Sequence, residues 1–169
     1  AGAAGAEMIG QSGVPLVDAC MRSLTATGWI NFRMRAMLLS HATFGLGLHW
    51  YEPALHLARL FTDFEPGIHY PQVQMQAGAT GTNAMRVYNP IKQAEDNDPT
   101  GAFIARWVPE LSPLPQEWRA KPWALPESLQ KRFGFQPGVD YPIPNVAEGK
   151  LSVTAFLKAN ATLDSGLPS

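Results

Sequence analysis

The sequence predicts an all-α, multihelical fold, and three observations support this expectation. Apolar residues recur every three or four positions over much of the first third of the chain, as they do on one face of a helix. Prolines and glycines stand where helices commonly start and stop. We find no internal repeat and no segment that reads as a convincing strand.

The first predicted helix lies within residues 12–28. Ser12 is a candidate cap, Pro15 falls in the first turn, and Gly28 provides the stop. The residues expected to share its buried face are Leu16, Ala19, Cys20 and Leu24.

Two further helices are predicted in succession. The first covers residues 29–50, and Gly45 and Gly47 should weaken or kink its end. The second covers residues 51–63, with Pro53 in its first turn. Spacing predicts that the buried side chains are Met34, Met37, Leu38 and His41 in the first of these, and Leu55, Ala58, Leu60 and Phe61 in the second.

The regular spacing ends after Asp63. Residues 63–90 contain several prolines and glycines among Gln, Tyr, His and Met, so we predict a long irregular segment of the kind that often carries function. A helix is expected again at residues 100–107, and the prolines beyond Leu111 predict short turns along the surface. The remaining expectations are a last helix at residues 151–160, a linker or expression scar at residues 1–11, and one domain portion at residues 12–169.

Composition limits the classes of function. The formal net charge is −1, so any contact with nucleic acid would be a local patch. Cys20 is the only cysteine, which excludes an intramolecular disulfide and a Cys-rich metal site, and favours a reducing cytoplasm. No apolar run approaches the roughly 20 residues that span a bilayer, and the recurring histidines lack carboxylates in a ligand pattern, so we expect neither a membrane span nor a metal site.

The most specific chemical feature is a pair of charged clusters. Arg33 and Arg35 lie in one predicted helix, and Asp63 and Glu65 follow the end of another. Side chains two positions apart on a helix point about 200° apart, so the two arginines face different surroundings. An arginine held by one carboxylate in an apolar setting is either a structural bridge or a stabiliser of negative charge on a bound ligand, and spacing leaves both open.

Several sequence blocks, in order, resemble the flavin-binding helical domain of the photolyase/cryptochrome family. They are "SGVPLVDACMRSL", "TGWINFRMRAMLLS", "HWYEPALHLARLFTDFEPG", "ATG" and "RVYNPIKQAEDNDPTGAFIARWVPEL". The resemblance covers roughly residues 12–111 and has a weaker tail. It implies the C-terminal portion of such a domain, either a fragment or a short member, that holds a folded FAD among helices.

The resemblance also implies roles for individual residues. Arg35 would pair with Asp63 beside the N5 and C4 edge of the flavin ring and stabilise negative charge on the reduced ring. Glu65 replaces a second Asp that usually bonds the N3 edge. The other expected flavin contacts are Trp29, Phe32, Ile68 and His69, and Arg33 would face either DNA or solvent.

Other positions depart from the family pattern. His69 replaces an Asn that faces flavin N5; it would act in catalysis beside Arg35 and Asp63 as a proton donor, or else be a core histidine bonded to a carbonyl. Trp50 matches the middle tryptophan of the electron-transfer relay, but Val73 replaces the flavin-proximal one. Met75 falls where a Trp stacks on the DNA lesion, and Phe32 where an Asn touches lesion and flavin.

The resemblance implies a deoxyribodipyrimidine photo-lyase, a carbon–carbon lyase in which blue light drives an electron from reduced FAD into a pyrimidine dimer in DNA. The candidate DNA contacts are Arg22, Arg33, Arg86 and Lys92. The alternatives are a cryptochrome-like photoreceptor without turnover, for which the lost relay tryptophan argues, and a flavin-free fragment. The family's phosphate-gripping segment and antenna domain would lie upstream, so a missing N-terminal half is an expected partner.

Overall fold

The computed structural model describes residues 10–79 and 87–144. The helix predicted at residues 151–160, Arg86, and nearly all of the predicted linker lie outside these residues. No strand occurs within the described part of the chain, so the all-α prediction is confirmed.

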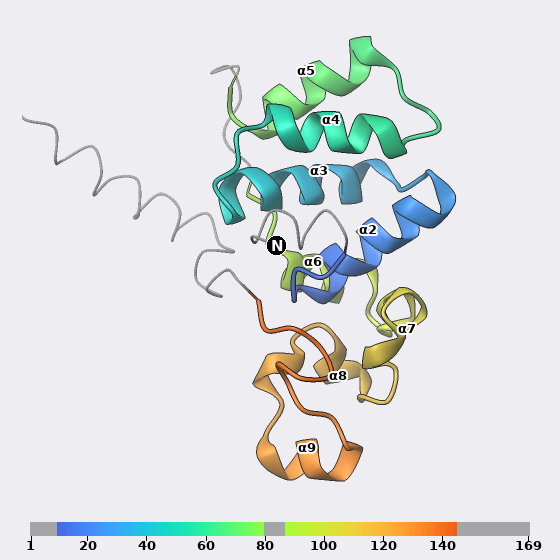
Figure 1. Ribbon diagram of the computed structural model, residues 1–169, viewed down its shortest axis with the longest axis vertical. Coiled ribbons are helices and arrows are strands. Elements are labelled where there is room, and N and C mark those ends of the chain that lie inside the picture. The colour runs from blue at the N-terminus through green and yellow to red at the C-terminus, as the bar shows by residue number, and fades with distance from the viewer. Residues whose placement is uncertain (1–9, 80–86, 145–169) are drawn as a thin grey trace, which may run out of the picture.

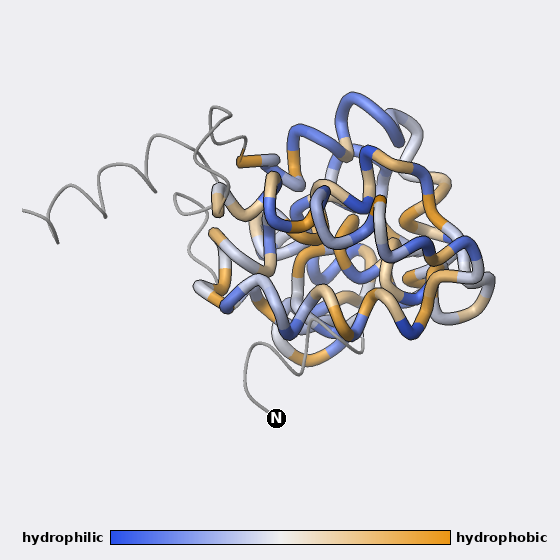
Figure 2. Tube along the Cα trace, turned by 90° about the horizontal axis from the view of Figure 1, so that it is seen from above, coloured by the Kyte–Doolittle hydropathy of each residue, from blue (hydrophilic) through white to orange (hydrophobic). Residues whose placement is uncertain are grey.

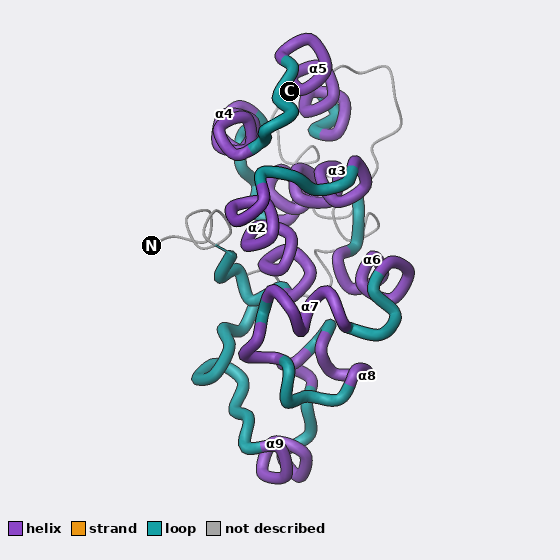
Figure 3. Tube along the Cα trace, turned by 90° about the vertical axis from the view of Figure 1, so that its right-hand side faces the viewer, coloured by secondary structure: helices purple, strands orange, loops and turns teal. Residues whose placement is uncertain are grey.

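The helices are stacked along the long axis of the molecule, from α5 and α4 through α3 and α2 to α6 and α7, and then to the short helices α8 and α9 (Figures 1 and 3). The longer elements are α2 (Pro15–Thr27), α3 (Phe32–Ser40), α4 (Tyr51–Leu60), α5 (Pro66–Gln76), α6 (Pro90–Asn97) and α7 (Ala102–Trp107). The C-terminal part contains η2 (Pro109–Leu111), α8 (Gln116–Arg119), η3 (Pro122–Ala124) and α9 (Glu127–Phe133). Hydrophilic and hydrophobic residues alternate along the helical turns, as expected for amphipathic helices (Figure 2).

Helix α2 lies at the centre of the core, and its predicted buried face is confirmed. It ends at the C-cap residue Gly28, whose φ of 73° lies in the left-handed region that glycine favours. Ser12 is not the N-cap, because that position belongs to Val14. The Ser12 hydroxyl instead donates to Asp18 and accepts from the Val14 amide.

The helix predicted at residues 29–50 is shorter than expected. Asn31 caps the start of α3 by accepting from the Met34 amide at 3.0 Å, so Trp29 and Ile30 precede the helix. After Ser40 the backbone widens into a π-helical turn, His41–Gly45, which ends the helix. Gly47 then takes a φ of 69°, as the weakening effect of the glycines predicted.

Helix α4 ends at Leu60, three residues before the predicted end at Asp63, because Phe61 turns to extended backbone. Its most buried side chains are Pro53, Ala54 and Leu57. The buried face therefore lies on a different side of the helix from the one predicted from Leu55, Ala58 and Leu60. Only Phe61 of that predicted set is buried.

The segment predicted to be irregular, residues 63–90, contains helix α5, and a further helix that was not predicted, α6, begins at its last residue. Pro66 begins α5 at a position where the missing amide costs nothing, and Pro71 lies inside the same helix. Asn89 begins α6 by accepting from the amides of Ile91 and Lys92. The proline-rich part beyond Leu111 does form short turns, together with short helices that the prolines start.

Candidate functional site

The guanidinium of Arg35 is held by three groups. Its Nη2 donates to both carboxylate oxygens of Asp63, at 2.8 and 2.7 Å, and its Nε donates to the Ile30 carbonyl at 3.0 Å. The ring of Phe61 lies 4.0 Å from the guanidinium carbon. The side chain of Arg35 is only 17% exposed and that of Asp63 is 48% exposed, so a mostly buried cation meets an accessible carboxylate.

Local backbone contacts bring these two side chains together. The left-handed turn at Gly28 directs its carbonyl to Thr62, whose amide and hydroxyl both donate to it, at 2.9 and 3.2 Å. The α2–α3 turn is therefore tied to the loop that carries Asp63, directly beside that residue. Asn31 caps α3 and so orients the first turn of the helix, from which Arg35 projects.

Helix α5 places the other predicted flavin contacts next to the ion pair. The backbone carbonyl of Glu65 accepts from the amides of Ile68 and His69, and the Glu65 side chain is exposed. Ile68, in the first turn, is 65% exposed. Sequence reasoning missed this helix, although Glu65-Pro66 is a helix-start signal.

His69 is a buried residue in this structure. Its Nε2 lies 2.9 Å from the Ala54 carbonyl and so donates to it, and the rings of Phe61, Phe64 and Tyr70 surround it at centroid distances of 5.3–5.8 Å. Burial lowers the pKa of His69, the hydrogen bond to Ala54 opposes this effect, and the charge of Arg35 adds to it. This is the geometry of a core histidine on a carbonyl, the second of the two alternatives that the sequence left open. A role for His69 toward flavin stays a prediction.

Two large apolar side chains near the start of α3 are open to solvent. Trp29 is 56% exposed and Phe32 is 55% exposed. These two side chains offer apolar surface that a bound group could cover. Their contact with flavin stays a prediction.

The two positions that the resemblance assigns to electron transfer lie at the start of α4 and within α5. Trp50 is half-buried at the N-cap of α4 and lies edge-on to Tyr51, with ring centroids 5.7 Å apart. Val73, which the resemblance aligns with the flavin-proximal tryptophan, is fully buried in α5. Tyr70 packs against Phe64 and His69.

The candidate DNA contacts differ in their availability. Arg33 is exposed and forms no ion pair with any described residue, as expected for a DNA contact or a solvated side chain. Arg22 is committed elsewhere: its guanidinium binds Glu110 at 2.9 Å and the carbonyls of Gly10 and Trp107. Lys92 pairs with Asp96 at 3.4 Å on the surface of α6. Met75, predicted to face the lesion, is 37% exposed.

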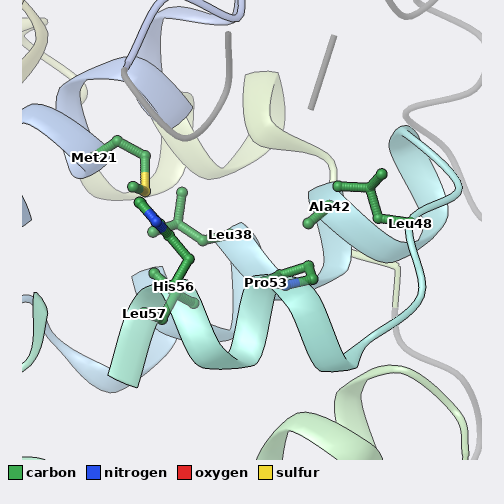
Figure 4. A pocket seen from close by; sticks show the side chains of 7 residues that line it. All are labelled: Met21, Leu38, Ala42, Leu48, Pro53, His56 and Leu57. Atoms are coloured by element: carbon green, nitrogen blue, oxygen red, sulfur yellow. The ribbon is translucent and has the colours of Figure 1, made fainter. Parts of the chain in front are cut away.

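A small cavity lies apart from the ion pair, between α2, α3 and α4 (Figure 4). Its volume is about 20 Å³, room for roughly one water molecule and not for an organic ligand. In Figure 4 the His56 ring rises from α4 toward Met21. Within residues 10–79 and 87–144 no helix is long and apolar enough to cross a bilayer, and no group of three or more His, Cys, Asp or Glu side chains could hold a metal ion.

Comparison with known proteins identifies the family. Residues 8–159 match the family described as the FAD binding domain of DNA photolyase. The chain is 41% identical over 138 residues to cryptochrome DASH of Gloeobacter violaceus, covering 81% of this chain and 28% of the relative. It is 32% identical over 144 residues to a deoxyribodipyrimidine photo-lyase of Alkalihalophilus pseudofirmus, covering 83% of this chain and 30% of the relative.

A solved structure is similar as well. The crystal structure of a Synechocystis sp. PCC6803 cryptochrome superposes with a TM-score of 0.84 at 34% identity, over 91% of this chain and 32% of that one. The chain thus spans less than a third of the length of these relatives. It belongs to the photolyase/cryptochrome family, as a FAD-binding domain of the photolyase type.

Proposed function

We propose that the chain forms the flavin-edge half of a photolyase-like site, in which light drives the repair of pyrimidine dimers in DNA. The observation that carries this proposal is the Arg35–Asp63 pair, a fixed cation beside an accessible carboxylate and exposed apolar side chains. Relatives named photo-lyase and relatives named cryptochrome both match the chain. Membership of the family is therefore established, and repair of DNA by this chain is the proposal.

The residues present fit the ring of FAD, the cofactor of this family. Arg35 and Asp63 offer a donor and an acceptor to the polar edge of a flavin ring, and Trp29, Phe32 and Ile68 offer apolar surface to its faces. When bound, FAD supplies the absorption of blue light and one-electron redox chemistry. The protein's part is to position the flavin ring and to balance its charge.

The contacts around the pair fix the position of the guanidinium. The Ile30 carbonyl accepts from Nε of Arg35, and the Phe61 ring lies against the guanidinium. Because the lowered pKa keeps His69 neutral at pH 7, Arg35 is the positive charge of this region. Arg33 and Met75 would then meet the DNA, at a local patch rather than through net charge.

A photoreceptor without turnover is the second candidate, and Val73 favours it. An aliphatic side chain cannot carry an oxidised intermediate in electron transfer, so photoreduction through the usual tryptophan would fail here. A flavin-free fragment is the third candidate. We also propose a cytoplasmic location, which a single cysteine, free and buried, favours.

One experiment separates the three. The purified protein is loaded with FAD, reduced chemically, mixed with an ultraviolet-irradiated oligonucleotide and exposed to blue light. Loss of dimers in the light and not in the dark supports repair. A flavin spectrum without loss of dimers supports the photoreceptor, and failure to retain FAD supports the third candidate.

A further inference from the structure

A second concave surface lies between the α2–α3 turn and α7, and neither Arg35 nor Asp63 lines it. Its volume is about 330 Å³, within the range of small-molecule sites. Trp29 forms one wall, and Phe103, Arg106 and Trp107 of α7 form the other.

The first wall is fixed by a hydroxyl. The Thr27 Oγ1 donates to the carbonyls of Ser23 and Trp29, at 2.7 and 3.0 Å, and accepts from the Trp29 amide at 3.3 Å. The backbone that carries the indole of Trp29 is thereby held in one conformation, although the indole itself is largely exposed.

The second wall is fixed by a carboxylate. The two oxygens of Asp98 accept from the amides of Phe103 and Ile104, at 3.0 and 2.9 Å, and so complete the first turn of α7. Residues of this short helix therefore face Trp29 in a fixed orientation. The floor between the walls is apolar and buried, formed by Ile30 and Met34.

The groove contains an available positive charge. Arg106 is exposed, and its guanidinium lies 5.4 Å from the centre of the Trp107 ring. Within the described part of the chain Arg106 joins no ion pair, whereas Arg22 and Arg35 are each bound to a carboxylate. A guanidinium stacked on indole keeps its N–H groups free for an anion.

We propose that this groove binds a nucleotide unit, with the base against the indole rings and the phosphate at Arg106. Aromatic faces with an arginine are the usual means of holding an unpaired base, because every base stacks and every nucleotide carries an anion. A purely apolar ligand would leave Arg106 unused, and an inorganic anion would leave the indole rings unused. The groove shares Trp29 with the proposed flavin site, but Arg35 and Asp63 do not line it, and Arg106 has no part in the flavin site. Arg106→Gln therefore tests the groove separately from the proposed repair function.

The chain offers a matched control. Arg132 also lies in the last turn of a short helix and stacks on the next aromatic residue, Phe133, at 5.7 Å. It is exposed like Arg106, and it is not among the residues that line the neighbouring concave surface beside Phe135. Arg106→Gln and Arg132→Gln thus remove the same charge from similar positions, and neither position is buried.

The test is a calorimetric titration of the full chain with AMP, with adenosine, with a short single-stranded oligothymidylate and with FAD. We expect AMP to bind, and Arg106→Gln to weaken it roughly tenfold, since a hydrogen bond to a charged group is lost. Adenosine, which lacks the phosphate, should bind wild type and Arg106→Gln equally. Arg132→Gln should leave all affinities unchanged.

The probes also identify the source of the nucleotide. If both probes depend on Arg106 and the oligothymidylate binds more tightly than AMP, the ligand is a DNA strand. If both depend on Arg106 and AMP binds at least as tightly as the oligothymidylate, the ligand is a free nucleotide. The proposal is overturned if neither binds, if Arg106→Gln and Arg132→Gln weaken binding equally, or if FAD alone depends on Arg106.

Discussion

Arg35 is oriented by contacts within the protein. Nε and Nη2 both donate to protein acceptors, and one face of the guanidinium rests on the Phe61 ring. Because Asp63 is nearly half exposed, water screens the pair, and it contributes more to geometry than to stability. Arg33, two positions earlier, has no such partner among the described residues, which matches the expectation that the two arginines face different surroundings.

Replacing Arg35 by Gln should weaken FAD binding by roughly 10- to 100-fold, because the ring edge loses a charged donor and Asp63 loses its counter-ion. The affinity is measured by titrating the apoprotein with FAD and following flavin fluorescence. Arg33→Gln is the control and should leave FAD affinity unchanged while reducing affinity for DNA. Equal FAD affinity of wild type and Arg35→Gln would remove Arg35 from the flavin site.

His41 should make the fold sensitive to acid. It is buried, both ring nitrogens lack a partner among the described residues, and burial lowers its pKa to about 4. Because its folded pKa lies below the ordinary value of 6.5, its neutral form contributes stability above pH 6.5, which is lost as the pH falls toward 4. The total loss is on the order of 3 kcal/mol.

The measurement is the urea midpoint of unfolding as a function of pH for wild type and for His41→Phe. The variant should lose much less stability between pH 6.5 and 4. The pKa of His69 is also lowered, so some sensitivity of the same sign remains in the variant. His49→Gln, at an exposed position, should behave like wild type, and parallel curves for wild type and His41→Phe would contradict the prediction.

Among the helices, α2 was predictable and α5 was not, for identifiable reasons. The apolar residues of α2 recur at helical spacing between a proline and a glycine. The spacing and the two terminal residues therefore predict the same helix. The buried face of α5 is His69, Val73 and Gln76, two polar residues out of three, and Pro71 interrupts it. Burial of these polar groups depends on tertiary partners such as the Ala54 carbonyl, which local sequence does not indicate.

The same distinction holds for the site. The Arg35–Asp63 pair was predictable, because opposite charges near the ends of neighbouring helices can meet, and the resemblance named the same two residues. The groove along α7 could not be predicted, because its walls are far apart in sequence and meet only through the packing of α7 on α2. The sequence also gives no indication of the π-helical turn that ends α3, apart from Gly45.

The turn between α2 and α3 should tolerate no side chain at Gly28. A Cβ there would collide with the Thr62 side chain, and the positive φ would add backbone strain. Gly134 is also a left-handed C-cap, of α9, but a Cβ there would meet nothing within 4 Å. Gly134→Ala should therefore cost only about 1–2 kcal/mol from backbone strain, and Gly28→Ala clearly more.

Urea unfolding of the two variants checks this prediction. Because Gly28 also binds the loop that carries Asp63, Gly28→Ala should weaken FAD binding too, whereas Gly134→Ala should not. Equal losses of stability in the two variants would show that the Gly28–Thr62 contact is not tightly packed.

Across the molecule, one buried carboxylate joins segments from both ends of the described chain. Asp18, in α2, accepts from the amide and hydroxyl of Ser12, from the Gly13 amide and from the Tyr141 hydroxyl. Burial raises the pKa of Asp18, and these hydrogen bonds partly offset the effect. A Cβ at Gly13 would lie 2.7 Å from the backbone of Ile143 and Pro144, so the C-terminal segment packs directly on this turn.

Tyr141→Phe should release this C-terminal segment. The variant leaves a buried carboxylate oxygen without one donor, which costs roughly 1–3 kcal/mol. Hydrogen exchange should speed up in residues 137–144, relative to wild type and to Tyr51→Phe, which alters an exposed tyrosine. Unchanged exchange in residues 137–144 would mean that apolar packing alone holds this segment.

The central claim is that the charge of Arg35, balanced by Asp63, lies against the bound flavin. Its most direct test is the midpoint reduction potential of bound FAD in wild type, in Asp63→Asn and in Asp96→Asn, which removes the carboxylate of the distant Lys92–Asp96 pair. Removing the Asp63 charge leaves Arg35 unbalanced, so Asp63→Asn should raise the potential, and Asp96→Asn should not. A potential that is the same in all three proteins would contradict the account.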